Sequence, residues 1–402
     1  MHFESALCCY YCLVSVFDVA IVGGGLIGAA TAFELAAGKL RVLVLDRREP
    51  GREASWAAAG MLSPGPDSPD ALPLVPLAKE SLRLYPEFVA AVEDASGISV
   101  AFTRDGALEV FLAPHAEAER DAVIARHRRL GLPIEPVSLD AARKIEPSIG
   151  AAVRAAAWLP EEATVDPRLL TDATLEAAGQ RGAEFRVGCA VTSLLRDGDS
   201  CTGVIAGGEC IAARHVIVAA GCYSHSIAGE RENDWLARYV PTNPVRGQMV
   251  ALQPSDFRLQ RVLRSERGYV VPRRDGRVVA GSTLEDAGFR KHVTAAGLRQ
   301  ILAAAVEMVP ALAGAEVVET WAGLRPGTPD SFPILGPTDI EGLLIATGHY
   351  RNGILLAPIT ARLVREWITQ GKTSFDAGIF SPLRFAEGTP NSPARRGASA
   401  RS

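Results

Sequence analysis

The sequence predicts an α/β protein with more than one structural unit, and three observations support this prediction. The chain has 402 residues, of which 48% are hydrophobic, whereas a single core stops growing at about 250 to 300 residues. Residues 17–46 pass from a strand-like run through a glycine turn to a helix-like run and a second strand, which is typical of parallel α/β units. Residues 268–283 instead have the turn chemistry of an antiparallel hairpin. We therefore expect two intertwined domains, the first α/β and the second α+β.

The composition argues against several classes of partner. The net charge of -4 gives no electrostatic footprint for nucleic acid or an anionic membrane surface, and the basic run 126–131 is short enough to be a solvated helix face. The seven cysteines are an odd number, unlike the paired framework of a secreted domain, so a reducing, cytoplasmic compartment is expected. Cys9 and Cys12 form one C-x-x-C motif, but no second ligand pair follows, and no metal site is expected.

Both ends of the chain are expected to lie outside the folded domains. Residues 6–17 are apolar, yet no Lys or Arg precedes them and Asp18 ends the run well short of a membrane span. We therefore expect residues 1–16 to be an N-terminal extension, neither a signal peptide nor an integral membrane segment. Residues 387–402 are rich in Pro, Ser and Arg, and this composition predicts a disordered tail.

The first α/β unit is predicted element by element. Asp18 to Val22 form a short run with β-branched residues, which predicts a buried strand. Ala29 to Ala37 favour a helix, and Arg41 to Leu45 favour a second buried strand. The order strand, glycine turn, helix, strand is that of a Rossmann-like unit.

The turn of this unit has the pattern Gly23-x-Gly25-x-x-Gly28, and Asp46 closes the second strand. In such a turn the first glycine makes the tight bend, the second lets the backbone approach a pyrophosphate, and the third lets the helix pack closely on the strand. The helix N-terminus then faces the phosphates, and the acidic residue accepts the ribose hydroxyls. The motif predicts dinucleotide binding, but by itself it does not distinguish FAD from NAD.

Three further segments favour FAD. Residues 48–65 are rich in small side chains, residues 213–224 form an apolar strand that ends in glycine, and residues 342–358 contain a strand, a glycine turn and a helix. An NAD dehydrogenase needs only the first motif. A flavin that lies across the ends of several strands requires close backbone approach from all of these places.

Together these segments resemble the FAD-dependent D-amino-acid oxidase superfamily, specifically its glycine oxidase branch, over about residues 17–372. The resemblance implies a Rossmann-like FAD-binding domain and a substrate domain built on a large antiparallel sheet that roofs the flavin. The expected FAD-binding segments are 17–88, 153–242 and 322–372, and the expected substrate segments are 89–152 and 243–321.

The resemblance also implies which residues contact the cofactor. No cysteine stands at 321–336, where related sarcosine oxidases attach their flavin covalently, so FAD is expected to be bound non-covalently. The expected FAD contacts are Gly23, Gly25, Gly28, Asp46, Arg47, Ser55, Gly60, Met61, Val191, Ala220, Gly221, Gly348, Arg351, Asn352, Gly353 and Ile354.

Tyr269 is the first candidate for substrate binding. The alternation of a strand places Tyr269 and Val271 on one face of the predicted hairpin, and Val270 and Pro272 on the other. The residues alone are equally compatible with a core tyrosine. The resemblance implies that the Tyr269 hydroxyl meets the carboxylate of the substrate.

Arg325 and Arg351 are the other two candidates. Arg325 stands in the mostly small and apolar stretch 321–330, where a permanent cation requires a carboxylate, a phosphate or an aromatic face. The resemblance implies that Arg325 clamps the substrate carboxylate bidentately. Two alternatives remain open, namely that it caps a loop carbonyl or pairs with Asp330. Arg351 matches a second arginine of the pocket, although packing on the flavin or on a backbone carbonyl explains it equally well.

The activity that the resemblance implies is oxidative deamination of glycine and small amino acids, with hydride transfer to FAD and no dedicated acid or base. Dioxygen is the expected electron acceptor, a role in thiamine thiazole synthesis is implied, and a homo-oligomer is expected. Three alternatives remain open: a sarcosine-type secondary-amine oxidase, a D-amino-acid dehydrogenase that reduces a quinone, and a non-catalytic flavin-binding subunit.

Overall fold

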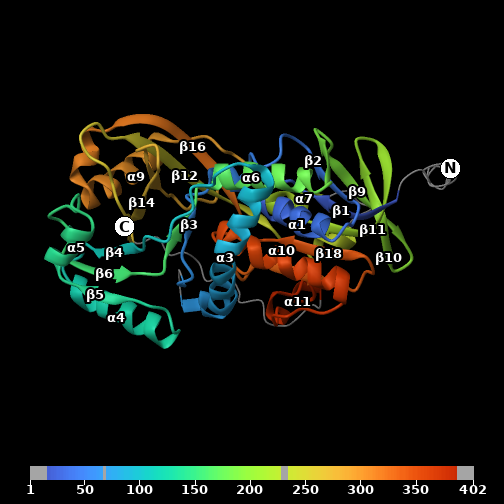
Figure 1. The fold of residues 1–402 in the computed structure, drawn as a ribbon, viewed down its shortest axis with the longest axis horizontal. Coiled ribbons are helices and arrows are strands. Elements are labelled where there is room, and N and C mark those ends of the chain that lie inside the picture. The colour runs from blue at the N-terminus through green and yellow to red at the C-terminus, as the bar shows by residue number, and fades with distance from the viewer. Residues whose placement is uncertain (1–15, 67–68, 228–233, 387–402) are drawn as a thin grey trace.

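The computed structural model describes residues 16–66, 69–227 and 234–386 (Figure 1). The expected N-terminal extension, apart from Val16, and the expected C-terminal tail therefore lie outside the described residues. The described chain forms two eight-stranded sheets and one two-stranded sheet. The two large sheets lie toward opposite ends of the long axis of the molecule in Figure 1.

The first large sheet is the Rossmann-like one. Its central strands β8, β2, β1, β11 and β18 are all parallel, while β17 joins β18 antiparallel and β9 and β10 extend from β11 as an antiparallel pair. The strands are β1 Phe17–Val22, β2 Val42–Asp46, β8 Glu184–Val187, β9 Val191–Asp197, β10 Ser200–Ala206, β11 Glu209–Val218, β17 Ile334–Pro337 and β18 Leu343–Thr347.

Helices cover this sheet because its central strands are apolar on both faces, as parallel strands usually are. The main helices are α1 Leu26–Ala37, α3 Val75–Ser96, α6 Pro167–Gln180 and α10 Gly353–Gln370. Helix α1 packs against both α6 and α10, and α3 packs against the same two helices. Together with one face of the sheet, these four helices enclose a core that contains Val19, Ile21, Phe33 and Leu356. The predicted first unit is thus present, with its helix beginning at Leu26.

The second large sheet has the order β16-β12-β15-β14-β13-β4-β6-β5. Every neighbouring pair is antiparallel except β13 and β4, which run parallel. The strands are β4 Ala107–Phe111, β5 Glu135–Val137, β6 Ala155–Leu159, β12 Asn243–Gln253, β13 Val262–Ser265, β14 Gly268–Pro272, β15 Val278–Gly281 and β16 Glu316–Gly327. The predicted hairpin is formed by β14 and β15, and Val270 and Val271 face different cores as the alternation requires.

Helix α9 (Ala295–Met308) packs on β12, β14 and β15 of this sheet. Helices α4 (Ala116–Arg129) and α5 (Leu139–Ile145) lie at its other end beside β6. The shorter elements are α2 Ala54–Ala57, β3 Met61–Leu62, β7 Ala163–Thr164, α7 Ser224–Ile227, α8 Asp234–Ala237 and α11 Leu383–Ala386. The described residues also form four 3₁₀ turns, of which Gly221–Tyr223 (η3) borders the site.

The structure corrects one expected domain boundary. Strand β6 (Ala155–Leu159) belongs to the second sheet, although the segment from 153 onward was expected in the FAD-binding domain. Its sequence is a continuous apolar run, and such a run is typical of a buried strand in either kind of sheet. In addition, β16 (Glu316–Gly327) is one unbroken strand across the expected boundary at 321 and 322.

None of the helices in the described parts of the chain has the length and apolar composition that crossing a bilayer requires.

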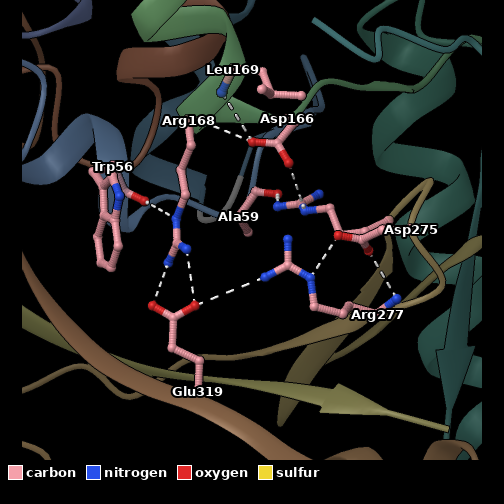
Figure 2. A network of polar contacts seen from close by, with 9 residues as sticks. Trp56, Ala59, Asp166, Arg168, Leu169, Asp275, Arg277 and Glu319 are labelled. Atoms are coloured by element: carbon pink, nitrogen blue, oxygen red, sulfur yellow. Dashed lines mark hydrogen bonds and ion pairs between the residues drawn. The ribbon is translucent and has the colours of Figure 1, made fainter.

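A polar network joins the two halves of the molecule (Figure 2). Arg168, near the start of α6, forms a bidentate ion pair with Glu319 on β16, with N–O distances of 2.9 and 3.0 Å. The Arg168 guanidinium also stacks 3.5 Å from the centroid of the Trp56 ring, and its Nε donates to the Trp56 carbonyl. Arg273, beyond β14, donates to the Ala59 carbonyl at 2.7 Å. The segment from Trp56 in α2 to Ala59 is therefore bound by Arg168 from one half of the molecule and by Arg273 from the other.

We expect a measurable coupling between Arg168 and Glu319. Because the pair is bidentate and mostly shielded from water, a double-mutant cycle with Arg168→Met and Glu319→Gln should give a coupling free energy of about 1 kcal/mol in urea unfolding. The exposed pair of Arg186 and Glu209, with an N–O distance of 3.4 Å, serves as the control, and its cycle should give a coupling close to zero. Equal coupling in the two cycles would contradict this account of the network.

Candidate active site

A large cavity of about 920 Å³ lies where the two sheets meet. On one side it is lined by the carboxyl ends of the parallel strands, represented by Val22, Leu45, Ala219 and Thr347. On the other side it is lined by the face of the second sheet that carries Met249, Tyr269 and Arg325. Ligands of open α/β sheets bind outside the carboxyl ends of the strands, so this position is the expected one for a dinucleotide.

The glycine turn has the close contacts that the motif requires. Gly23 has a φ of 111°, and a β-carbon there would come 2.6 Å from the carbonyl oxygen of Ala219. At Gly28, a β-carbon would overlap the carbonyl oxygen of Gly23, so only glycine lets α1 approach β1 so closely. Gly25 is different, because its φ of -69° suits any residue and its nearest neighbour would be the Ser55 Oγ at 3.4 Å. A side chain at Gly25 would therefore project into the cavity.

Two polar side chains border the same turn. Asp46, at the end of β2, accepts hydrogen bonds from the backbone N–H groups of Gly24 at 2.8 Å and Arg48 at 3.0 Å. The Ser55 hydroxyl oxygen accepts a bond from the N–H of Leu26 at 2.9 Å, which is the first N–H of α1. The carboxylate and the start of the helix are thus fixed in place beside the cavity.

A cluster of charged and aromatic side chains surrounds Arg47, which lines the cavity. The Arg47 guanidinium lies 3.5 Å from the centroid of the Tyr223 ring and pairs with Glu53 at 3.1 Å. Glu53 also binds Lys291 from the second half of the chain at 2.8 Å, and Tyr223 stacks on Phe289 of the same loop. Arg47 therefore belongs to a contact that spans the two halves.

The predicted cofactor residues are brought together around the cavity with one exception. Gly28 does not line it and instead packs α1 against the turn. All the other predicted residues line the cavity, namely Gly23, Gly25, Asp46, Arg47, Ser55, Gly60, Met61, Val191, Ala220, Gly221, Gly348, Arg351, Asn352, Gly353 and Ile354.

Tyr269 lies in a row of residues that crosses the second sheet. Met249 on β12 pairs with Trp321 on β16 and with Gly281 on β15, and Gly281 in turn pairs with Tyr269 on β14. Directly paired residues point to the same face of a sheet, and Met249 and Tyr269 both line the cavity. The Tyr269 side chain is half-buried, and its hydroxyl donates to the Met249 Sδ at 3.4 Å. Because sulfur is a weak acceptor, this contact leaves the hydroxyl suited to a stronger partner.

Arg325 lies on the same face, four residues along β16 from Trp321. Its guanidinium donates to the Ser282 Oγ at 2.6 Å and to the Thr283 carbonyl at 3.2 Å, and it lies against Gly247, where a β-carbon would overlap it. These bonds fix the direction of the guanidinium with two of its five N–H donors.

One alternative for Arg325 is wrong, and the other holds in part. Asp330 pairs with Arg384 at 2.7 Å and is not the partner of Arg325. Arg325 does donate to a loop carbonyl, that of Thr283, but its side chain also lines the cavity.

His349 and Arg351 follow β18, and both line the cavity, but they differ in burial. His349 is 3% exposed, and its Nε2 lies 3.0 Å from the Thr360 Oγ1. Burial lowers the pKa of His349 to about 3, so the ring is neutral near pH 7. It packs against α10, which carries Thr360. Arg351 is exposed and lines the cavity.

Sequence reasoning did not identify the residues that orient Arg325, namely Gly247, Ser282 and Thr283. Gly247 and the pair Ser282-Thr283 come from strand β12 and from the end of β15, and only the strand order brings them beside β16. It also missed the polar residues at the far end of the cavity, Glu109, His127 and Arg264.

The described residues fit FAD. Gly23 and Gly25 open the turn to the cavity, the first turn of α1 carries no acidic residue, and the cavity runs from Asp46 at the ribose-binding position to Tyr269 and Arg325. A helix N-terminus without acidic side chains is suited to a pyrophosphate. Within residues 16–66, 69–227 and 234–386 no group of three or more His, Cys, Asp or Glu side chains could hold a metal ion.

The fold and the site thus define a dinucleotide-binding protein whose cavity lies between a Rossmann-like sheet and a second, largely antiparallel sheet. Comparison with known families identifies it further: the model of the DAO family, described as FAD dependent oxidoreductase, matches residues 18–367. The chain belongs to this family of enzymes, whose cofactor is FAD.

Two glycine oxidases and a longer bifunctional protein are among the individual proteins to which the chain is similar. Glycine oxidase from Pseudomonas putida is 35% identical over 367 residues, which are 91% of this chain and 98% of that protein. The crystal structure of glycine oxidase from Geobacillus kaustophilus superposes with a TM-score of 0.86 at 32% identity and covers 92% of this chain and 98% of that one. The bifunctional protein ThiO/ThiG from Trichormus variabilis is 34% identical over 94% of this chain, but the chain spans only 56% of that longer protein.

Proposed function

We propose that the enzyme oxidises glycine and other small amino acids with FAD, and that dioxygen reoxidises the flavin. The observation that carries this proposal is the placement of Tyr269 and Arg325 in the same cavity as the glycine turn. Glycine oxidases of similar length and fold support the choice of substrate.

Arg325 and Tyr269 act as the carboxylate site. Arg325 is held by Ser282 and Thr283 with its remaining donors available to a carboxylate, and the Tyr269 hydroxyl adds a further donor. A substrate held by its carboxylate has its Cα and amine fixed in position. Fixing the reacting groups in this way lowers the entropic part of the reaction barrier. When bound, FAD supplies the acceptor for the hydride and its two electrons from Cα.

The reaction balances without a dedicated protein acid or base. Glycine enters with a neutral amine, whose lone pair forms the C=N bond as Cα loses a hydride. Water then hydrolyses the imine to glyoxylate and ammonia, and dioxygen takes up two electrons and two protons to give hydrogen peroxide. The residues of the chain bind, orient and shield the substrate.

Several finer points belong to the same proposal. We infer that FAD is bound non-covalently, that the enzyme acts in the cytoplasm as a homo-oligomer, and that the glycine imine feeds thiamine thiazole synthesis. The bifunctional relatives named ThiO/ThiG support the last point. The two-domain division, with β6 moved to the substrate domain, is also a proposal, as is the assignment of the individual FAD and substrate contacts.

Simultaneous measurement of oxygen uptake and products tests this function. Purified enzyme given glycine should consume dioxygen and release peroxide, glyoxylate and ammonia in equal amounts. Product formation that requires an added quinone and proceeds without oxygen uptake would instead identify a dehydrogenase. Turnover of sarcosine but not of glycine would favour a secondary-amine oxidase.

A further inference from the structure

The segment 57–61, with the sequence AAAGM, lies between the cavity and the second sheet. All five of its residues line the cavity, and Gly60 and Met61 are among the proposed FAD contacts. Ala59 packs in the same apolar cluster as Val271 of β14. Except for Met61, no residue of the segment has a side chain that is long enough to anchor it, so its position depends on bonds to its backbone.

Two neighbouring carbonyl groups of the segment accept hydrogen bonds from outside it. The Ala59 carbonyl accepts a bond from the Arg273 guanidinium at 2.7 Å, and the Gly60 carbonyl accepts one from the backbone N–H of Val165 at 2.9 Å. The bond from Arg273 is the stronger of the two because its donor is charged. Gly60 has a φ of 77°, and a β-carbon there would overlap the Val165 carbonyl oxygen, so the segment already lies in close contact on that side.

Arg273 is a buried cation that is held from two sides. Its side chain is 8% exposed, and its Nε lies 3.8 Å from the Asp166 Oδ2. Burial lowers the pKa of Arg273 and Asp166 opposes this shift, but an arginine keeps its charge near pH 7. The other oxygen of Asp166 caps α6 by accepting bonds from the N–H groups of Arg168 and Leu169. The guanidinium therefore lies between a helix cap and the Ala59 carbonyl.

The strand that leads to Arg273 also carries Tyr269. The two residues are four positions apart, and beyond the end of β14 the Arg273 N–H still bonds to the Arg277 carbonyl across the hairpin at 2.8 Å. Alternate residues of a strand point to one face, so Tyr269, Val271 and Arg273 share a face of the sheet. The segment 57–61 packs on this face. One strand therefore contacts the cavity through Tyr269 and the segment through Arg273.

We propose that Arg273 is a positioning residue that fixes the segment 57–61 against bound FAD and so sets the flavin's place relative to Tyr269 and Arg325. It does not line this cavity, and it acts through the Ala59 carbonyl. The part of the inference that concerns FAD requires only that the segment contacts the cofactor. The part that concerns the substrate rests on the proposed function.

FAD binding to three variants tests the first part. Arg273→Met should weaken FAD binding about tenfold or more, because it removes a hydrogen bond from a charged donor. Arg273→Lys keeps a cation beside Asp166 that can donate to the Ala59 carbonyl, so its dissociation constant should lie between those of the wild type and Arg273→Met. Arg277→Met removes an arginine of the same network that bonds to Asp275 and not to Ala59, and it should bind FAD as the wild type does. Fluorescence titration of the apoproteins gives these dissociation constants, and urea unfolding gives their stabilities.

Anaerobic reduction of the FAD-saturated variants by glycine tests the second part. Because Tyr269 and Arg325 remain on the sheet, Arg273→Met should need nearly the same glycine concentration as the wild type for half-maximal reduction. Its rate of flavin reduction at saturating glycine should fall about tenfold or more, since a misplacement of about 1 Å costs up to about a hundredfold in rate. Arg273→Lys should recover part of this rate. Loss of Arg325 itself should have the opposite pattern, because it removes a substrate contact.

The titrations and the kinetics have distinguishable outcomes. If Arg273→Met lowers the stability of the apoprotein but binds FAD with the wild-type dissociation constant, the residue is only structural and the inference is overturned. Equal weakening of FAD binding by Arg277→Met and Arg273→Met would overturn it as well. An unchanged rate of flavin reduction in Arg273→Met would overturn the part that concerns the substrate. If the wild type does not oxidise glycine, the proposed function fails, while the FAD titrations still decide whether Arg273 positions the segment.

Discussion

Replacing Arg325 with methionine should raise the Michaelis constant for glycine by about ten- to a thousandfold while FAD remains bound. Removing one partner of a buried, hydrogen-bonded charge pair costs about 2 to 5 kcal/mol, and tenfold in affinity corresponds to about 1.4 kcal/mol. The side chain of Arg325 extends from β16 into the cavity and bonds to Ser282 and Thr283 of the neighbouring loop. Methionine keeps much of the stem and removes the donors, so substrate binding should suffer far more than the fold.

Two further variants sharpen this measurement. Arg325→Lys keeps the charge but loses the planar fork, so its Michaelis constant should lie between those of the wild type and Arg325→Met. Arg299→Met removes an exposed arginine on α9 and should behave like the wild type in steady-state kinetics. A Michaelis constant for glycine that is unchanged in Arg325→Met would refute the role of this residue.

The second large effect should separate two glycines of the same turn. Gly25→Ala adds a methyl group that projects into the cavity from an ordinary backbone conformation. It should change the free energy of unfolding of the apoprotein by less than about 0.5 kcal/mol and weaken FAD binding by about tenfold or more. Gly28→Ala forces a β-carbon against the Gly23 carbonyl and should destabilise the apoprotein by about 1 to 3 kcal/mol, the usual cost of overpacking.

Urea unfolding of the FAD-free proteins and fluorescence titration with FAD measure the two effects. The test is the difference between the two variants: Gly25→Ala should mainly weaken FAD binding, and Gly28→Ala should mainly lower the free energy of unfolding. If Gly25→Ala destabilised the apoprotein as much as Gly28→Ala, then Gly25 would serve the packing of α1 rather than the approach of a cofactor.

The Rossmann-like half could be predicted from sequence because its signals are local. The turn at Gly23, Gly25 and Gly28 fixes the position of the strand before it and of the helix after it to within a few residues. Few other backbone arrangements satisfy this glycine spacing. The hairpin of β14 and β15 was predicted for the same reason, from a turn between two short strands. Strand β6 was assigned to the wrong half because an apolar run of five residues does not specify which sheet it joins.

The substrate side depends on contacts that are distant in sequence. Arg325 could be singled out as an arginine among small and apolar residues, but its bonds to Ser282 and Thr283 follow from the order of strands in the second sheet. His127 has no local signal at all, since it is one histidine in a helix rich in charged residues. Only the packing of α4 beside β4 and β6 buries it and brings it to the lining of the cavity.

Anaerobic mixing of the purified, FAD-loaded enzyme with glycine tests the central claim most directly. The account predicts that glycine abolishes the visible absorption of oxidised flavin and that admitting air restores it with release of one peroxide per flavin. Arg325→Met should show the same loss of colour only at much higher glycine concentrations. Flavin that stays oxidised in the wild type at saturating glycine would contradict the assignment of this cavity as a glycine oxidation site.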